Sequence, residues 1–137
     1  MAAPETRAVL DASCFLRAVL DDLEDAQRWM DALGSGSTEA LSSELLYAEV
    51  SHALVRQTRL GLIAPDYAVR VVREVAELPI RSTPCRLLAE PSYAMALEHG
   101  VTAYDAQYLA LAEAEDAVLV TADRGLAAAA SRGILLD

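Results

Sequence analysis

Four acidic residues have surroundings that set them apart from ordinary surface carboxylates: Asp11, Glu49, Asp105 and Asp123. The first and the last come just after continuous apolar runs, residues 8–10 and 117–121, of the kind that forms buried strands. Carboxylate oxygens without histidine or cysteine are the ligands that Mg²⁺ or Mn²⁺ prefers. Two such ions about 3.5–4 Å apart can activate a water molecule and hold the leaving oxygen of a phosphodiester. The residue types therefore predict a divalent-metal site for phosphoryl transfer.

Glu49 and Asp105 lie in segments of helical periodicity. Glu49 shares its helix face with apolar residues, Leu46 among them, so its side chain is expected to lean toward the core. Burying an unpaired charge is costly, so a metal ion or an arginine would have to compensate, unless the carboxylate reaches outward to water. Asp105 follows Thr102 by three residues, which is close to a capping box, so it could serve only as a helix cap. Leu109 shares its face, and both interpretations of Asp105 stay open.

The other two acids also have a structural alternative. Asp11 and Asp123 each precede a predicted helix, where an aspartate is as typical of an N-cap as of a ligand. Ser13 and Thr121 each lie two residues away from one of them, and their hydroxyls could bind the carboxylates or a metal-bound water, or form local caps. The prediction of a site depends on four acids that one sheet could bring together.

The elements that must position these acids alternate along the chain. Strands are expected at residues 8–10, near Leu41, and at 79–82, 117–121 and 134–136. Helices are expected at residues 15–23, 26–33 with a stop at Gly34, 43–58 with Ser43 as N-cap, 65–78, 85–100, from Thr102 onward and after Asp123. This alternation predicts an α/β fold, a three-layer α/β/α domain with a central parallel sheet. Ligands of such sheets bind beyond the carboxyl ends of the strands, where Asp11 and Asp123 both fall.

Length and charge limit the class of protein. A chain of 137 residues predicts one domain over residues 1–137. It has 21 acidic residues and 11 basic ones, all of them arginine, for a net charge of −10. An acidic surface repels phosphates, which argues against a protein that coats nucleic acid and favours a cation-loaded site or a basic protein partner. No apolar run approaches the roughly 18–20 residues that span a membrane, and residues 1–7 lack the apolar core of a signal peptide, so a cytoplasmic protein is expected.

Several other classes of site are disfavoured. Cys14 and Cys85 match no zinc motif and are expected in the core, and His52 and His99 are expected to have structural roles. An aspartyl-phosphate phosphatase or a receiver domain would need a lysine, which the chain lacks. Neither a P-loop nor a glycine-rich dinucleotide motif is present.

The four acidic segments together resemble those of the PIN-domain family, and within it the VapC-type toxins of prokaryotic toxin–antitoxin pairs. The segments are VLDAS at residues 9–13, YAEVSHAL at 47–54, TAYDAQYLALA at 102–112 and LVTADR at 119–124. Their order and spacing are specific, and the resemblance covers nearly the whole chain. It implies a PIN-like fold and a metal-dependent endoribonuclease. The Mg²⁺- or Mn²⁺-binding acids would be Asp11, Glu49, Asp105 and Asp123, with Ser13 and Thr121 as helpers.

The resemblance also implies partners: an RNA substrate, a small cognate antitoxin that covers the site, and a second copy in a homodimer. Without lysine, contacts to RNA would come from arginines such as Arg17, Arg56, Arg59 or Arg124. Apolar helix faces are expected at the dimer interface unless they only complete the core, and they contain Trp29, Met30, Val71 and Val72. The alternative function is a PIN-like binding module without catalysis, whose acidic pocket receives a basic protein partner.

Overall fold

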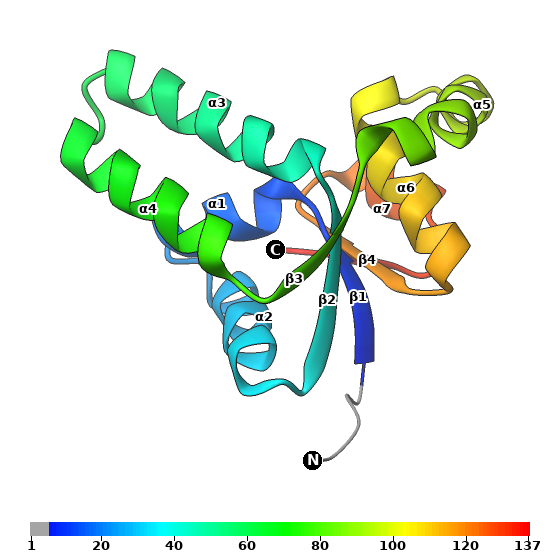
Figure 1. Ribbon diagram of the computed structural model, residues 1–137, viewed down its shortest axis with the longest axis horizontal. Helices are drawn as coiled ribbons and strands as arrows, with labels where there is room; N and C mark the ends of the chain where they lie inside the picture. The colour runs from blue at the N-terminus through cyan, green and yellow to red at the C-terminus, as the bar shows by residue number, and fades with distance from the viewer. Residues whose placement is uncertain (1–5) are drawn as a thin grey trace.

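Residues 6–137, the part of the chain that the computed structural model describes, alternate between strands and helices (Figure 1). The strands are β1 (Thr6–Leu10), β2 (Thr38–Ser43), β3 (Ile80–Thr83), β4 (Val118–Thr121) and β5 (Gly133–Leu135). The helices are α1 (Ala12–Leu20), α2 (Glu24–Ser35), α3 (Leu45–Arg59), α4 (Pro65–Glu77), the 3-10 helix η1 (Cys85–Leu88), α5 (Ala89–His99), α6 (Ala103–Glu115) and α7 (Arg124–Ala129). The expectation that residues 1–7 hold no signal peptide falls mostly outside the described residues.

The strands form one sheet in the order β3-β2-β1-β4-β5, and every neighbouring pair is parallel. β1 lies in the middle, where Val9 is opposite Leu41 of β2 and Leu119 of β4. The chain proceeds from β1 to β2 and β3 on one side and returns to the other side for β4 and β5, so the strand order reverses between β1 and β4. The predicted parallel sheet is confirmed, and its reversal point is where such sheets bind ligands.

Helices cover both faces of the sheet, with α1 to α4 on one side and α5 to α7 on the other (Figure 1). Alternate residues of β1 pack against the two helical layers, because successive side chains of a strand point to opposite faces of the sheet. Ala8 and Leu10 pack in a core with Phe15 of α1, whereas Val9 packs in a second core with Leu109 of α6. The predicted three-layer α/β/α fold is therefore confirmed.

Short polar side chains begin the helices that lie near the acids. Thr102 Oγ1 accepts a hydrogen bond from the Asp105 backbone N at 3.0 Å, so Thr102 caps α6 as predicted. Ser43 belongs to the end of β2, yet its Oγ accepts a hydrogen bond from Leu45 N at 3.1 Å and so satisfies the first turn of α3. The predicted N-cap of α6 is confirmed, whereas the prediction of Ser43 as N-cap is wrong by one residue, because α3 begins at Leu45 and its N-cap is Glu44.

Glycines decide two other local features. The predicted stop of α2 at Gly34 is wrong: the helix continues through it, and Gly36 ends the helix with φ +82°, because this left-handed conformation closes a helix and favours glycine. Gly133 opens β5 where a Cβ atom would lie 2.0 Å from the Ala127 carbonyl oxygen of α7. Only glycine allows the edge strand to approach α7 this closely.

Several predictions about single residues can be compared with their burial. Cys14 is buried as predicted, but Cys85 is only half-buried, because it begins η1 at the rim of a cavity beside α5 and α6. The apolar faces proposed for the dimer pack against the core of α1 to α4, which favours the alternative that they complete the core: Trp29, Met30, Val71 and Val72. No helix of residues 6–137 is long and apolar enough to cross a membrane.

Candidate active site

The fold brings the four predicted acids to the carboxyl edge of the sheet. Asp11 directly follows β1 and Asp123 comes two residues after β4, and the turn after β1 is joined to β4 by a hydrogen bond from Asp11 N to the Val120 carbonyl oxygen at 3.4 Å. Glu49 comes from the second turn of α3, which follows β2, and Asp105 from the first turn of α6. Acids from four separate segments therefore meet where the strand order reverses.

Two hydroxyl groups hold the Asp11 carboxylate. Ser13 Oγ donates to Oδ1 and Thr121 Oγ1 donates to Oδ2, both at 2.5 Å. The same hydroxyl oxygens accept hydrogen bonds from the turn after β4, Ser13 from Ala122 N at 2.8 Å and Thr121 from Asp123 N at 3.0 Å. Ser13 and Thr121 thus orient Asp11 and connect it to the segment that carries Asp123.

Burial changes the acidity of Asp11. Its side chain is 6% exposed, and this desolvation raises its pKa from 3.8 to about 6 although Ser13 and Thr121 stabilise the charged form. The charge of Glu49 raises the pKa further. Near neutral pH, Asp11 is a buried carboxylate with neighbouring negative charge.

Glu49 is half-buried and has a partner that the sequence did not predict. The Tyr108 hydroxyl, from α6, donates a hydrogen bond to Glu49 Oε1. Burial raises the pKa of Glu49, the hydrogen bond from Tyr108 opposes this, and the charge of Asp105 raises the pKa again. Burial and the neighbouring carboxylate likewise raise the pKa of Tyr108, which is 1% exposed and therefore stays a hydrogen-bond donor.

Asp105 and Asp123 complete the row of acids. Asp105 is half-buried, and burial together with the charge of Asp123 raises its pKa. Thr102 caps the Asp105 backbone, and a hydrogen bond from its side chain opposes the rise in the pKa of Asp105. Asp123 is exposed and caps α7, because its Oδ1 accepts a hydrogen bond from Leu126 N at 2.9 Å. Asp11 and Asp123 are thus helix caps and members of the acidic row at once.

The row has the chemistry of a cation site. Each acid repels the next: Asp11 and Glu49, Glu49 and Asp105, Asp105 and Asp123. A hard divalent cation would relieve this repulsion, and the donors are the carboxylate oxygens that such ions prefer. As the side chains stand within residues 6–137, no three histidine, cysteine or acidic side chains form a group that could hold a metal ion. The donor set fits a divalent ion by the chemistry of its oxygen ligands and by their mutual repulsion, not by a preformed ligand geometry.

Buried polar residues tie the sheet edge to α6, and these too were missed. Ser43 Oγ donates to Gln107 Oε1 at 2.8 Å, and Gln107 Nε2 donates to the Cys85 carbonyl oxygen at 3.2 Å. Ser42 Oγ donates to the Leu10 carbonyl oxygen at 2.7 Å. The signal for them was the pair of serines at the end of a buried strand, because buried polar groups require hydrogen-bond partners.

The remaining candidates lie at the periphery. His52 and His99 are exposed, and His99 Nε2 lies 3.8 Å from a carboxylate oxygen of the adjacent Glu98. Arg17 and Arg124 line one cavity of about 240 Å³ together with Ala122, beside the acidic row. The other two predicted arginines, Arg56 and Arg59, are exposed in the last turn of α3.

Fold and site together define an α/β/α domain with an acidic site at the reversal point of a parallel sheet. Residues 8–131 match the model of the PIN domain, and the chain belongs to the PIN-domain family. Ribonuclease VapC3 of Pyrobaculum aerophilum is 35% identical over 124 residues, which cover 88% of this chain and 92% of the relative. Ribonuclease VapC1 of Mycobacterium tuberculosis is 38% identical over 119 residues, which cover 77% of this chain and 87% of the relative. These relatives confirm the resemblance to VapC-type proteins.

Solved structures agree with this assignment. The crystal structure of PAE2754 from Pyrobaculum aerophilum superposes with a TM-score of 0.76 at 27% identity and covers 98% of this chain and 93% of its own. A chain of a toxin–antitoxin complex from Klebsiella pneumoniae superposes with a TM-score of 0.59 at 20% identity, covering 85% and 86%. The second likeness concerns the fold alone.

Proposed function

We propose that residues 1–137 form a single PIN-like nuclease domain, a divalent-metal-dependent endoribonuclease and the toxin of a toxin–antitoxin pair in the cytoplasm. The observation that carries the proposal is a row of four acids in which each carboxylate is repelled by the negative charge of its neighbour: Asp11, Glu49, Asp105 and Asp123. RNA is proposed as substrate because both curated relatives are ribonucleases by name.

The acidic residues of the row would hold Mg²⁺ or Mn²⁺. Bound there, a divalent ion would lower the pKa of a water molecule and neutralise charge on the scissile phosphate. Ser13 and Thr121 keep the Asp11 carboxylate oriented, and Tyr108 does the same for Glu49. Because Asp11 has a pKa of about 6 and must be ionised to bind metal, activity should fall below pH 6.

Arg17 and Arg124 are proposed as contacts to the RNA backbone. They face one cavity beside the segment of Asp123, and both are well exposed, at 51% and 81% of their side-chain surface. Their ion pairs, with Asp21 at 3.0 Å and with Asp137 at 3.9 Å, are on the surface, where such pairs are weak and easily exchanged for phosphates.

A small antitoxin is the proposed protein partner, a suggestion supported by the likeness to a chain of a toxin–antitoxin complex. An apolar groove of about 520 Å³ runs between α3 and α4, where Val55 and Val69 are 42% and 47% exposed and Arg59 and Arg73 lie at the rim. An apolar antitoxin segment with acidic flanks would fit this groove, and a basic side chain could reach the acidic row.

We also propose a homodimer, for which Leu87 on η1 supplies exposed apolar surface.

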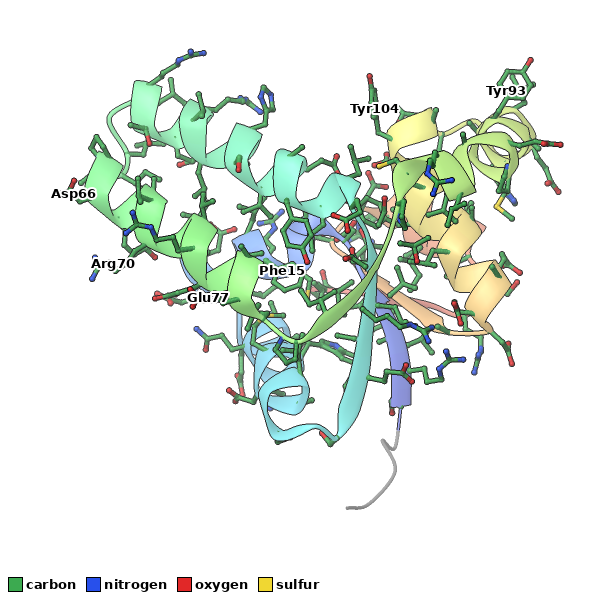
Figure 2. All side chains as sticks on the ribbon, viewed as in Figure 1. Phe15, Asp66, Arg70, Glu77, Tyr93 and Tyr104 are labelled. Carbon is green, nitrogen blue, oxygen red and sulfur yellow. The ribbon has the colours of Figure 1, made fainter. Side chains whose placement is uncertain are left out.

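The test is cleavage of RNA by the purified protein with Mg²⁺, with Mn²⁺ and with EDTA. We expect cleavage that depends on metal, is lost in Asp11→Asn and is kept in Asp66→Asn. Asp66 is the matched control, since it is an exposed aspartate in the first turn of α4 and lies far from the sheet edge (Figure 2). If Asp11→Asn cleaves as fast as the parent protein, contamination explains the activity and the non-catalytic binding module takes its place.

A further inference from the structure

A small uncharged cavity lies beside the turn of α6 that carries Asp105. It measures about 270 Å³ and is bounded by η1, α5, the start of α3 and the first turns of α6. Cys85, Ala89, Ser92, Tyr104 and Gln107 are among the residues that line it, and no lining residue carries a charge. The chain has a net charge of −10, yet the residues that line this cavity are uncharged.

The cavity contains a polar group without a partner. Ser92 is 2% exposed, and its Oγ is the buried side-chain atom within residues 6–137 that has no hydrogen-bond partner. A buried hydroxyl is normally satisfied, because leaving it unpaired costs free energy. Gln107, in the same wall, is fixed by Ser43 and by the Cys85 carbonyl oxygen. Ser92 is therefore the group in this wall that requires a partner from outside.

An aromatic ring stands at the same cavity. Tyr104 lines it and is 66% exposed, and Figure 2 shows the side chain projecting away from the start of α6. Tyr104 directly precedes Asp105, so the ring and one acid of the row belong to the same helical turn. A ligand that stacks on this ring would have its neighbouring atoms near the site of cleavage.

We propose that this cavity binds one nucleobase of single-stranded RNA, which stacks on Tyr104 and is hydrogen-bonded along its edge by Ser92. The proposal rests on the proposed ribonuclease function. Unpaired bases of RNA are typically recognised by aromatic stacking and by hydrogen bonds to their edges. The cavity lies below the range of about 300–1,000 Å³ that is typical of larger ligands, so it suits a flat base and leaves the phosphates outside. Its lack of charge suits a base, whereas Arg17 and Arg124, which line a separate cavity, suit the backbone.

The first experiment measures binding without cleavage. Short labelled single-stranded RNA is titrated with the Asp11→Asn protein and Mg²⁺, and fluorescence anisotropy gives the dissociation constant. Adding Tyr104→Leu should weaken binding about 5- to 150-fold, the effect of one lost base–aromatic stack. The matched control is Tyr93→Leu, because Tyr93 is equally exposed at 67%, lies on α5 and does not line the cavity. The control should leave binding unchanged.

An abasic nucleotide, moved one position at a time along the RNA, locates the bound base. One position should weaken binding to the Asp11→Asn protein, and this effect should vanish when Tyr104→Leu is also present. Randomising the base at that position then tests Ser92. Ser92→Ala should flatten the preference for one base, and Ser92→Thr, which keeps a hydroxyl, should restore it.

The proposal is overturned by no RNA binding, by equal weakening in Tyr93→Leu, or by the same abasic profile with and without Tyr104. A loss of RNA binding by Tyr104→Leu that accompanies a change from dimer to monomer in sedimentation would also overturn it, since the cavity would then serve contact between copies. Failure of the proposed function is distinguishable, because RNA that binds at Tyr104 but is never cleaved by the parent protein contradicts only the nuclease activity.

Discussion

Asp11 combines burial with charge, and this has a consequence for stability. Its carboxyl group has a pKa of about 6 in the folded chain, against 3.8 as the ordinary value, because it is 6% exposed. An acid whose pKa is raised by folding binds its proton more tightly in the folded state. The stability that it contributes is therefore fully present below pH 3.8 and is lost as the pH rises through 6. We predict that, in EDTA, the Asp11→Asn protein does not show this decrease in the free energy of unfolding as the pH rises.

The size of the effect follows from the shift. About two pKa units at 1.36 kcal/mol each give a total loss of about 3 kcal/mol in the free energy of unfolding. Roughly half of it, about 1.4 kcal/mol, falls between pH 5 and pH 8 by the same linkage relation. This interval lies above the isoelectric point of about 4.5. The loss is read most directly from the urea midpoint, which a change of about 1.4 kcal/mol shifts by roughly 0.5–1.4 M at an m-value of about 1–3 kcal/mol/M.

The assay is urea unfolding of the parent protein and of Asp11→Asn at steps between pH 5 and pH 8, in EDTA and at constant ionic strength. The pKa values of Glu49 and Asp105 are also raised, but both residues are present in both proteins, so the difference between the two curves reports Asp11 together with its coupling to Glu49. The parent's stability relative to the variant should fall by about 1.4 kcal/mol across this interval. A difference that stays constant, or that rises with pH, would refute the reasoning.

Four further substitutions test separate parts of the molecule. Tyr108→Phe removes the donor to Glu49 and should cost about 1–3 kcal/mol in urea unfolding; an unchanged midpoint would contradict this role. Gly133→Ala places a methyl group 2.0 Å from a carbonyl oxygen and should destabilise by about 1–3 kcal/mol, whereas Gly34→Ala, with open space in a helix, should stabilise by about 0.5–1 kcal/mol. Equal signs for both would be inconsistent with the packing at β5. Asp105→Asn should melt at or above the parent's temperature in EDTA and gain less stability from Mg²⁺; a lower melting temperature with an equal gain would make Asp105 a cap only.

The periodicity of the chain predicts most of the fold, because local patterns reflect which face of each element is buried. Residues 8–10 and 117–121 show this well, since fully buried parallel strands are apolar throughout and are adjacent in the sheet. The end of α2 was misplaced because either of two nearby glycines could stop a helix, and only the backbone of Gly36 takes the left-handed conformation. Such a choice depends on where the following strand must begin.

The acids of the candidate site and the two hydroxyls that hold Asp11 were predicted, whereas the partners of Glu49 and Ser43 were missed. For Asp11 and Asp123 the choice between helix cap and site residue was a false one, because the oxygen that caps the next helix belongs to a carboxylate at the sheet edge. The partners of Glu49 and Ser43 come from α6, far along the chain. Tyr108 lies 59 residues after Glu49, and Gln107 lies 64 residues after Ser43. Local patterns do not show which polar residue of one helix will meet the strands and helices of another.

The measurement that tests the central claim most directly is Mn²⁺ binding by the parent protein and by four single variants, Asp11→Asn, Glu49→Gln, Asp105→Asn and Asp123→Asn. Titration followed by electron paramagnetic resonance reports free Mn²⁺, with Asp66→Asn as the control outside the site. If the four carboxylates act as one metal site, each variant should weaken binding about tenfold or more, and Asp66→Asn should bind as the parent does. Mn²⁺ affinity that is the same in all six proteins, or absent from the parent, would contradict the assignment of the acidic row as the metal site.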